Sequence, residues 1–105
     1  MPDKNKSVFL SDLKVKGNVI EKDSIIIDGD IDGNVNADYV ETYNRSIIKG
    51  NISAKNVIIG GKLKGDINSN KVHIRGTAEV EGTIKQKALS IEEGSVLKIK
   101  TEIKK

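Results

Sequence analysis

The segment "VHIRGTAEVEGTI", residues 72–84, decides the fold class of this chain. Aliphatic residues, alanine and glycine occupy every second position, and polar or charged residues occupy the positions between them. This two-residue period is that of a β-strand with one face buried and the other in water. No useful length of the chain repeats apolar residues at helical spacing, so the sequence predicts an all-β protein.

Five short strings related to this segment recur along the chain. Each has an aliphatic residue, a polar residue, glycine, a polar residue and then Val or Ile: "VKGNV" at 15–19, "IDGNV" at 31–35, "IKGNI" at 48–52, "LKGDI" at 63–67 and "VEGTI" at 80–84. Their glycines are 16, 17, 15 and 17 residues apart. A regular period of this length is typical of a solenoid, in which each repeat forms one coil.

The alternation shifts once in four of the five repeats, across the five-residue steps 35–40, 52–57, 67–72 and 84–89, whereas the first repeat has a six-residue step from Val19 to Ile25. An odd step would turn buried residues outward unless the backbone bends, so each step predicts a corner. Other corners are expected near Gly29, Gly61, Gly76 and Gly94, where the missing side chains let the chain bend. The sequence therefore predicts a right-handed parallel β-helix of triangular cross-section, with about six coils of 15–17 residues.

The length of 105 residues favours one domain. We expect a short N-terminal tail over residues 1–11, the β-helical domain over 12–99 and a short charged tail over 100–105. The first residues lack the apolar segment of a secretory signal, and no apolar run approaches the roughly 20 residues that cross a bilayer. Cysteine is absent, which suits a reducing compartment, and we expect a cytoplasmic protein.

The net charge of +3 raises the question of nucleic-acid binding. Only two of the 18 basic residues are arginines, Arg45 and Arg75, and the only aromatic residues are Phe9, Tyr39 and Tyr43. So few aromatic side chains cannot provide the stacking platforms that single-stranded nucleic acids require. The sequence therefore predicts no nucleic-acid partner.

The string "DGDIDG" at 28–33 resembles the start of an EF-hand calcium loop. Such a loop needs a bidentate Glu at its twelfth position, which here is Tyr39, and a helix on each side. On a strand, Asp28, Asp30 and Asp32 would share one outer face with Cα atoms about 6.8 Å apart, which is wide for one ion. We interpret the three aspartates as an exposed acidic row and predict no metal site.

The single histidine, His73, lies between Val72 and Ile74, which take the inner parity, so it is expected at the surface. The chain shows no nucleophile paired with a base and no glycine-rich phosphate loop between a strand and a helix. We therefore predict neither enzymatic activity nor a cofactor.

Several runs in register resemble the bactofilin family: "GDIDGNVNA" at 29–37, "IKGNISAKNVII" at 48–59 and "LSIEEGSV" at 89–96. The resemblance extends over about residues 12–97. It implies a bacterial cytoskeletal scaffold with a right-handed β-helical core, which assembles end to end into filaments without nucleotide or other cofactor. It also implies association with the inner face of the cytoplasmic membrane, and cell-wall enzymes or membrane proteins as partners beside the protein itself.

An open solenoid has an unpaired strand edge at each end, and no capping helix is evident in this sequence. Leu97 and Ile99 follow the last recognisable repeat, so we expect them to form the C-terminal polymerisation interface, where many bactofilins carry an aromatic residue. At the other end, Val8, Phe9 and Leu10 are candidates for a contact with another subunit or with a membrane. The alternative function is a β-helical adaptor module that binds partners without polymerising.

Overall fold

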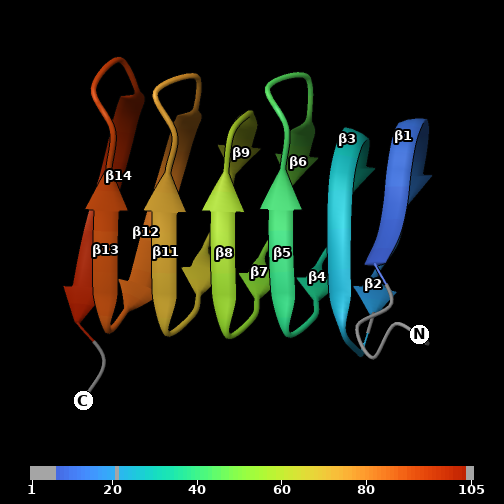
Figure 1. The fold of residues 1–105 in the computed structure, drawn as a ribbon, viewed down its shortest axis with the longest axis horizontal. Helices are drawn as coiled ribbons and strands as arrows, with labels where there is room; N and C mark the ends of the chain where they lie inside the picture. Colours follow the sequence, from blue (N-terminus) through green and yellow to red (C-terminus); the bar gives the residue numbers. More distant parts are fainter. Residues whose placement is uncertain (1–6, 21, 104–105) are drawn as a thin grey trace, which may run out of the picture.

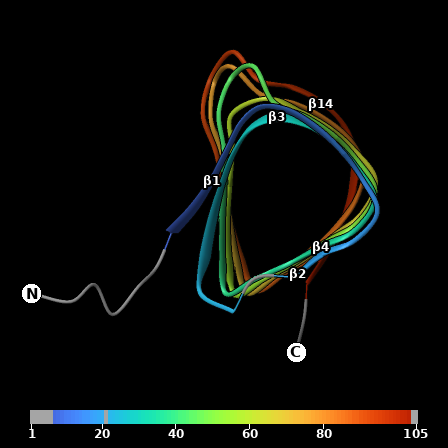
Figure 2. The ribbon, with the colours of Figure 1, turned by 90° about the vertical axis from the view of Figure 1, so that its right-hand side faces the viewer.

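The computed structural model describes residues 7–20 and 22–103, with side chains from Lys14 onward, and these residues form one solenoid of parallel strands (Figure 1). The front strands in Figure 1 point upward and those behind point downward while the chain advances from right to left, so the solenoid is right-handed. The view along the axis shows the chain winding around one interior in three sides (Figure 2). The predicted all-β solenoid is thus confirmed.

The three sides are called faces A, B and C. Face A contains the first parts of β1 (Ser7–Lys16) and β3 (Ser24–Asp32), then β5 (Tyr39–Thr42), β8 (Asn56–Ile59), β11 (Lys71–Ile74) and β13 (Ala88–Ile91). Face B contains the second parts of β1 and β3, then β6 (Ile47–Lys49), β9 (Lys62–Lys64) and the first parts of β12 (Glu79–Gln86) and β14 (Val96–Ile103). Face C contains β2 (Val19–Ile20), β4 (Val35–Asn36), β7 (Ile52–Ser53), β10 (Ile67–Asn68) and the second parts of β12 and β14.

We call one strand or part-strand on a face a rung. The chain makes about five turns rather than the six coils predicted. The strands also extend beyond the expected domain boundaries of 12 and 99, since β1 begins at Ser7 and β14 ends at Ile103.

The core consists of columns of aliphatic side chains that stack from rung to rung. On face B one column runs through Val15, Ile31, Ile48, Leu63, Val80 and Leu97. Face A contributes a column through Ile25, Val40, Val57, Val72 and Leu89. Face C contributes one through Val19, Val35, Ile52, Ile67 and Ile84. Because parallel rungs lie about 4.8 Å apart, each branched side chain covers the one beneath it and excludes water.

The corner between faces B and C is built from glycine in five rungs, namely Gly17, Gly33, Gly50, Gly65 and Gly82. Each has a positive φ, a conformation in which a Cβ is strained. In four of these rungs a Cβ would also overlap the carbonyl oxygen of the preceding glycine in the column, as for Gly65 above Gly50. The sequence alternation treats these glycines as inner strand positions, but the structure makes them corners.

The residues that follow these glycines form a ladder of hydrogen bonds, in which a side-chain oxygen accepts from the backbone amide of the next rung. Asn18 Oδ1 accepts from the amide of Asn34 at 3.3 Å, and Asn34 Oδ1 accepts from Asn51 at 3.1 Å. Asn51 Oδ1 in turn accepts from Asp66, and Asp66 Oδ1 from Thr83, both at 3.2 Å. These bonds satisfy backbone amides that the corner removes from the strand ladder.

The corner between faces A and B differs from rung to rung. It lies within β3 around the buried Gly29, but it becomes a protruding loop at residues 43–46, 75–78 and 92–95 (Figure 1). Two polar side chains are buried here: Thr42 Oγ1 accepts from the Gly60 amide at 3.0 Å, and Ser46 Oγ donates to the Tyr43 carbonyl at 2.7 Å. Thr42 takes the inner position that Ile27 occupies one rung earlier, so the apolar and polar alternation is weaker over residues 40–52.

Candidate functional site

The C-terminal end of the solenoid is uncovered over the described residues. The strands β13 and β14 each pair with one neighbour only, β11 and β12 respectively. Three aliphatic side chains there are strongly exposed: Ile91 at 48%, Val96 at 53% and Ile103 at 77%. One rung earlier, Ile74 beneath Ile91 and Gln86 beneath Ile103 are buried, whereas Glu79 beneath Val96 is exposed. The exposure of Ile91 and Ile103 therefore results from the missing next rung, and Val96 faces outward.

The two residues predicted to form the C-terminal interface both lie at this end. Leu97 is in register with Val80 and is the last member of the face B core column. Ile99 is in register with Gly82, so it occupies the sixth position of the glycine column. Both side chains are partly buried and pack against the core, while nothing among the described residues lies beyond them along the axis.

Two further aliphatic residues belong to this surface and were not in the predicted interface. Leu89 is the last member of a face A core column and packs against the core, and Ile91 continues the column that contains Ile74. The 17-residue step from Val72 to Leu89 and from Ile74 to Ile91 carried this signal. The repeat register therefore could have found them from sequence.

At the N-terminal end, β3 is the one described strand that pairs with β1. Its backbone places Val8, Phe9 and Leu10 in register with Ile25, Ile26 and Ile27. Their side chains lie outside the part of the structure that is described. Among the described residues, the two ends thus present the edges of two strands each, β1 and β2 at one end of the solenoid axis and β13 and β14 at the other (Figure 1).

The three aspartates of the EF-hand-like string alternate with buried residues along β3. Asp28 is 10% exposed, and its Oδ2 accepts a hydrogen bond from Arg45 Nη2 at 3.1 Å. Among the described residues, no group of three or more His, Cys, Asp or Glu side chains is arranged to hold a metal ion. The described strands and turns also include no helix long and apolar enough to cross a membrane.

His73 lies on the outer side of face A, where its Nε2 is 2.6 Å from Glu92 Oε2. The Gly76 amide donates to the other oxygen of Glu92 at 3.3 Å. The hydrogen bond from His73, followed by the one from Gly76, lowers the pKa of Glu92 from its usual 4.5. Both contacts join neighbouring rungs, so His73 has a structural partner.

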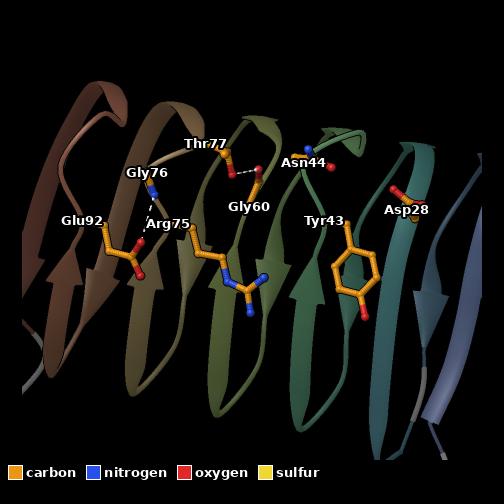
Figure 3. Close-up of a pocket in the computed structure, with 8 residues that line it drawn as sticks. All are labelled: Asp28, Tyr43, Asn44, Gly60, Arg75, Gly76, Thr77 and Glu92. Carbon is orange, nitrogen blue, oxygen red and sulfur yellow. Dashed lines mark hydrogen bonds between the residues drawn. The ribbon is translucent and has the colours of Figure 1, made fainter.

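A hollow of about 440 Å³ lies beside the corner between faces A and B (Figure 3). Figure 3 shows that the Arg75 side chain extends toward Tyr43, over the rung of Gly60. Arg75 Nη2 donates to Glu41 Oε2 at 3.2 Å, and Tyr39 donates to Oε1 of the same carboxylate at 3.2 Å. Burial and then the Glu41 charge raise the pKa of Tyr39. These contacts therefore link the rung that ends at Arg75 to that of Glu41, across the rung between them.

A comparison of the chain with models of protein families matches residues 7–102 with the family described as "Bactofilin: Polymer-forming cytoskeletal". The match includes both terminal rungs of the solenoid. No curated protein and no solved structure matches the chain.

Proposed function

Because this chain belongs to the bactofilin family of polymer-forming cytoskeletal proteins, we propose that it assembles end to end into filaments without nucleotide, metal or other cofactor. The filaments act as a cytoplasmic scaffold, at the inner face of the membrane, that helps to organise cell shape or to position cell-wall enzymes. Its first partner is another copy of itself.

The uncovered core at the C-terminal end carries this proposal. Along one column, Leu63 is 1% exposed and Val80 is 3% exposed, whereas Leu97 at the end is only partly buried. The outer edge of β14 beside it also has no partner strand within residues 7–20 and 22–103. Soluble solenoids usually cover such an end with a capping unit, because an open edge pairs with other chains.

We assign the C-terminal contact to Leu97 and Ile99. Covering one aliphatic side chain contributes roughly 1.5–3 kcal/mol, and a second subunit would also pair the exposed backbone edge. A charged side chain at position 97 would lose this gain and would desolvate a charge against an apolar surface.

We assign the second contact to the N-terminal residues Val8, Phe9 and Leu10. The surface they form faces either the next subunit or a membrane. Co-sedimentation with vesicles of anionic lipid distinguishes the two: loss of vesicle binding by filaments of the Phe9→Ser protein supports a membrane contact, and loss of the filaments themselves supports a subunit contact.

The test of the filament proposal is the Leu97→Arg substitution, with Val96→Arg as its matched control. Val96 is the neighbouring residue on the same strand, but it is exposed on the outside of the solenoid. We expect Leu97→Arg protein to remain in the supernatant after high-speed sedimentation, with the β-sheet circular dichroism of the wild type. The Val96→Arg protein should form filaments visible by negative-stain electron microscopy.

Normal filaments of both Leu97→Arg and Ile99→Arg proteins would show that the contact lies elsewhere. If wild-type protein stays folded and monomeric, the alternative of a non-polymerising adaptor module is favoured. A requirement for nucleotide, or dissolution of the filaments by a chelator, would contradict cofactor-free assembly.

A further inference from the structure

The outer surface of face B has a charge pattern that repeats every three rungs. Its six rungs read "KVK" at 14–16, "DID" at 30–32, "IIK" at 47–49, "KLK" at 62–64, "EVE" at 79–81 and "VLK" at 96–98. In each triplet the central residue belongs to the core column and the two flanking residues face outward. The formal charges of successive rungs are therefore +2, −2, +1, +2, −2 and +1.

The strand register arranges these outward residues in two columns along the axis. One column contains Lys14, Asp30, Ile47, Lys62, Glu79 and Val96. The other contains Lys16, Asp32, Lys49, Lys64, Glu81 and Lys98. The outward residues of face C, by contrast, are Ile20, Asn36, Ser53, Asn68, Lys85 and Glu102, which show no such period.

The surface shape of face B repeats with the same three-rung period as its charge. A shallow groove of about 320 Å³ lies between the columns over the first three rungs, and one of about 200 Å³ lies over the last three. We call each group of three rungs a unit. The lysines and acidic residues of each unit line the groove that lies over it. Ile47, on the third rung, is 37% exposed and is the only large apolar residue on the outside of the first unit.

This pattern is complementary to itself under one two-fold rotation. An axis parallel to the strands, passing through the rung of Ile47, places rung 1 on rung 5 and rung 2 on rung 4 of a second copy. Lys14 and Lys16 then oppose Glu79 and Glu81. Ile47 packs against its own copy at the axis, in the isologous manner of two-fold interfaces.

The acidic pair of rung 2, Asp30 and Asp32, opposes Lys62 and Lys64 in the same arrangement. Lys49 meets its own copy beside the axis, one rung from Asp32 on each side. Other registers place like charges together: an axis through rung 4 puts Lys62 and Lys64 on themselves, and an axis between rungs 3 and 4 puts Asp30 on Glu79. Only the axis through Ile47 opposes all four doubly charged rungs with opposite charge.

We propose that face B is a lateral interface between two antiparallel copies of this chain in neighbouring filaments, registered by these charge pairs. The inference rests on the proposed filament function. Five opposed rungs about 4.8 Å apart give a contact about 24 Å long and only three residues wide, far less than the roughly 800 Å² per partner of a stable dimer. A single subunit therefore pairs weakly, and a filament pairs through many contacts acting together.

Two double variants test the charge register. Asp30→Lys/Asp32→Lys and Lys62→Glu/Lys64→Glu each place like charges on two pairs of opposing rungs. We expect each variant to form single filaments, with the fraction pelleted at low speed reduced several-fold to the level of the Leu97→Arg protein. When filaments of one variant are mixed with filaments of the other, opposite charges again face each other across the interface. Filaments of the two variants should therefore pair with one another.

Matched controls carry the same charge changes away from face B. Asp38→Lys/Glu93→Lys and Lys55→Glu/Lys87→Glu alter exposed residues at the other corners of the solenoid. Each control should still form paired filaments on its own. Raising the salt from 50 mM to 500 mM should separate wild-type pairs without dissolving the filaments, because screening weakens exposed charge pairs first.

High-speed sedimentation measures all filaments, whereas low-speed sedimentation and filament width by electron microscopy measure pairing. Wild-type filaments that stay single at low salt would overturn the lateral interface and leave the proposed function intact. Reversed variants that pair as well as the controls would also overturn it. An absence of filaments in every wild-type condition would contradict the proposed function, and the lateral interface with it.

Discussion

Two corners of the same solenoid follow opposite rules. The corner between faces B and C places a glycine with positive φ in each of five rungs, followed by a polar residue that continues a side-chain ladder. The corner between faces A and B is a buried glycine in one rung and a protruding loop in others, with buried polar side chains where the loops begin. In these five rungs the first corner has one residue type, with Ile99 at the sixth position of the column, whereas the second corner has many.

The difference follows from how closely the backbones approach. At the glycine corner each rung lies directly on the carbonyl of the rung below it, so a side chain cannot be inserted without separating the rungs. At the other corner the chain moves outward into the loops, and side chains such as Thr42 and Ser46 satisfy the backbone groups that this leaves. The corner between faces B and C, which we call the regular corner, therefore sets the spacing of the coils. The corner between faces A and B, which we call the variable corner, tolerates sequence change.

The largest effect should come from a side chain at the regular corner. Gly65→Ala combines a strained φ of 144° with overlap between its Cβ and the Gly50 carbonyl oxygen. Strain of this kind costs about 1–3 kcal/mol, and the overlap brings the total beyond about 4 kcal/mol. We expect urea unfolding to show a strongly destabilised or unfolded protein.

Gly17→Ala is the control that separates strain from overlap. Gly17 has a φ of 119°, but no atom lies within 4 Å of the position its Cβ would take. Only the conformational cost of about 1–3 kcal/mol remains, so this protein should fold. Equal destabilisation of the two variants would show that the close stacking of the glycines is not what restricts the corner.

The two corners also explain what the sequence could and could not predict. The five-residue step 35–40 breaks the alternation of inner residues, so its corner was visible in the sequence. The step from Ile31 to Val35 spans four residues across Gly33 and Asn34, which preserves the alternation and hides a corner that the structure shows.

The features of the C-terminal surface also divide into those that the sequence could predict and those that it could not. The position of Leu97 at the end of the core followed from the repeat register and the absence of another repeat. The assignment of Leu97 and Ile99 as the polymer contact stays a prediction. The partners of Asp28 and Arg75 depend on side-chain reach across 17 and 34 residues of sequence, which strand periodicity does not encode.

A smaller effect is expected at the variable corner from Thr42→Val. The change keeps the shape of the side chain but removes the oxygen that accepts from the buried Gly60 amide. An unsatisfied buried amide costs about 1–3 kcal/mol, which should lower the midpoint of urea unfolding without unfolding the protein. Thr83→Val, where the side chain makes none of the ladder bonds, should change stability by no more than about 0.5 kcal/mol.

The smallest effect concerns the exposed contact that joins the last two rungs at the variable corner. Since the hydrogen bonds from His73 and Gly76 lower the pKa of Glu92 below 4.5, the folded state favours its carboxylate more than the unfolded state does. This stabilisation is complete above about pH 4.5 and is lost as the pH falls through the lowered pKa. Glu92→Gln protein should therefore show a shallower fall in unfolding free energy between pH 5 and pH 3 than the wild type. The neighbouring Glu93→Gln protein should keep the wild-type slope, and equal slopes in the wild type and both variants would mean that the contact with His73 contributes nothing in solution.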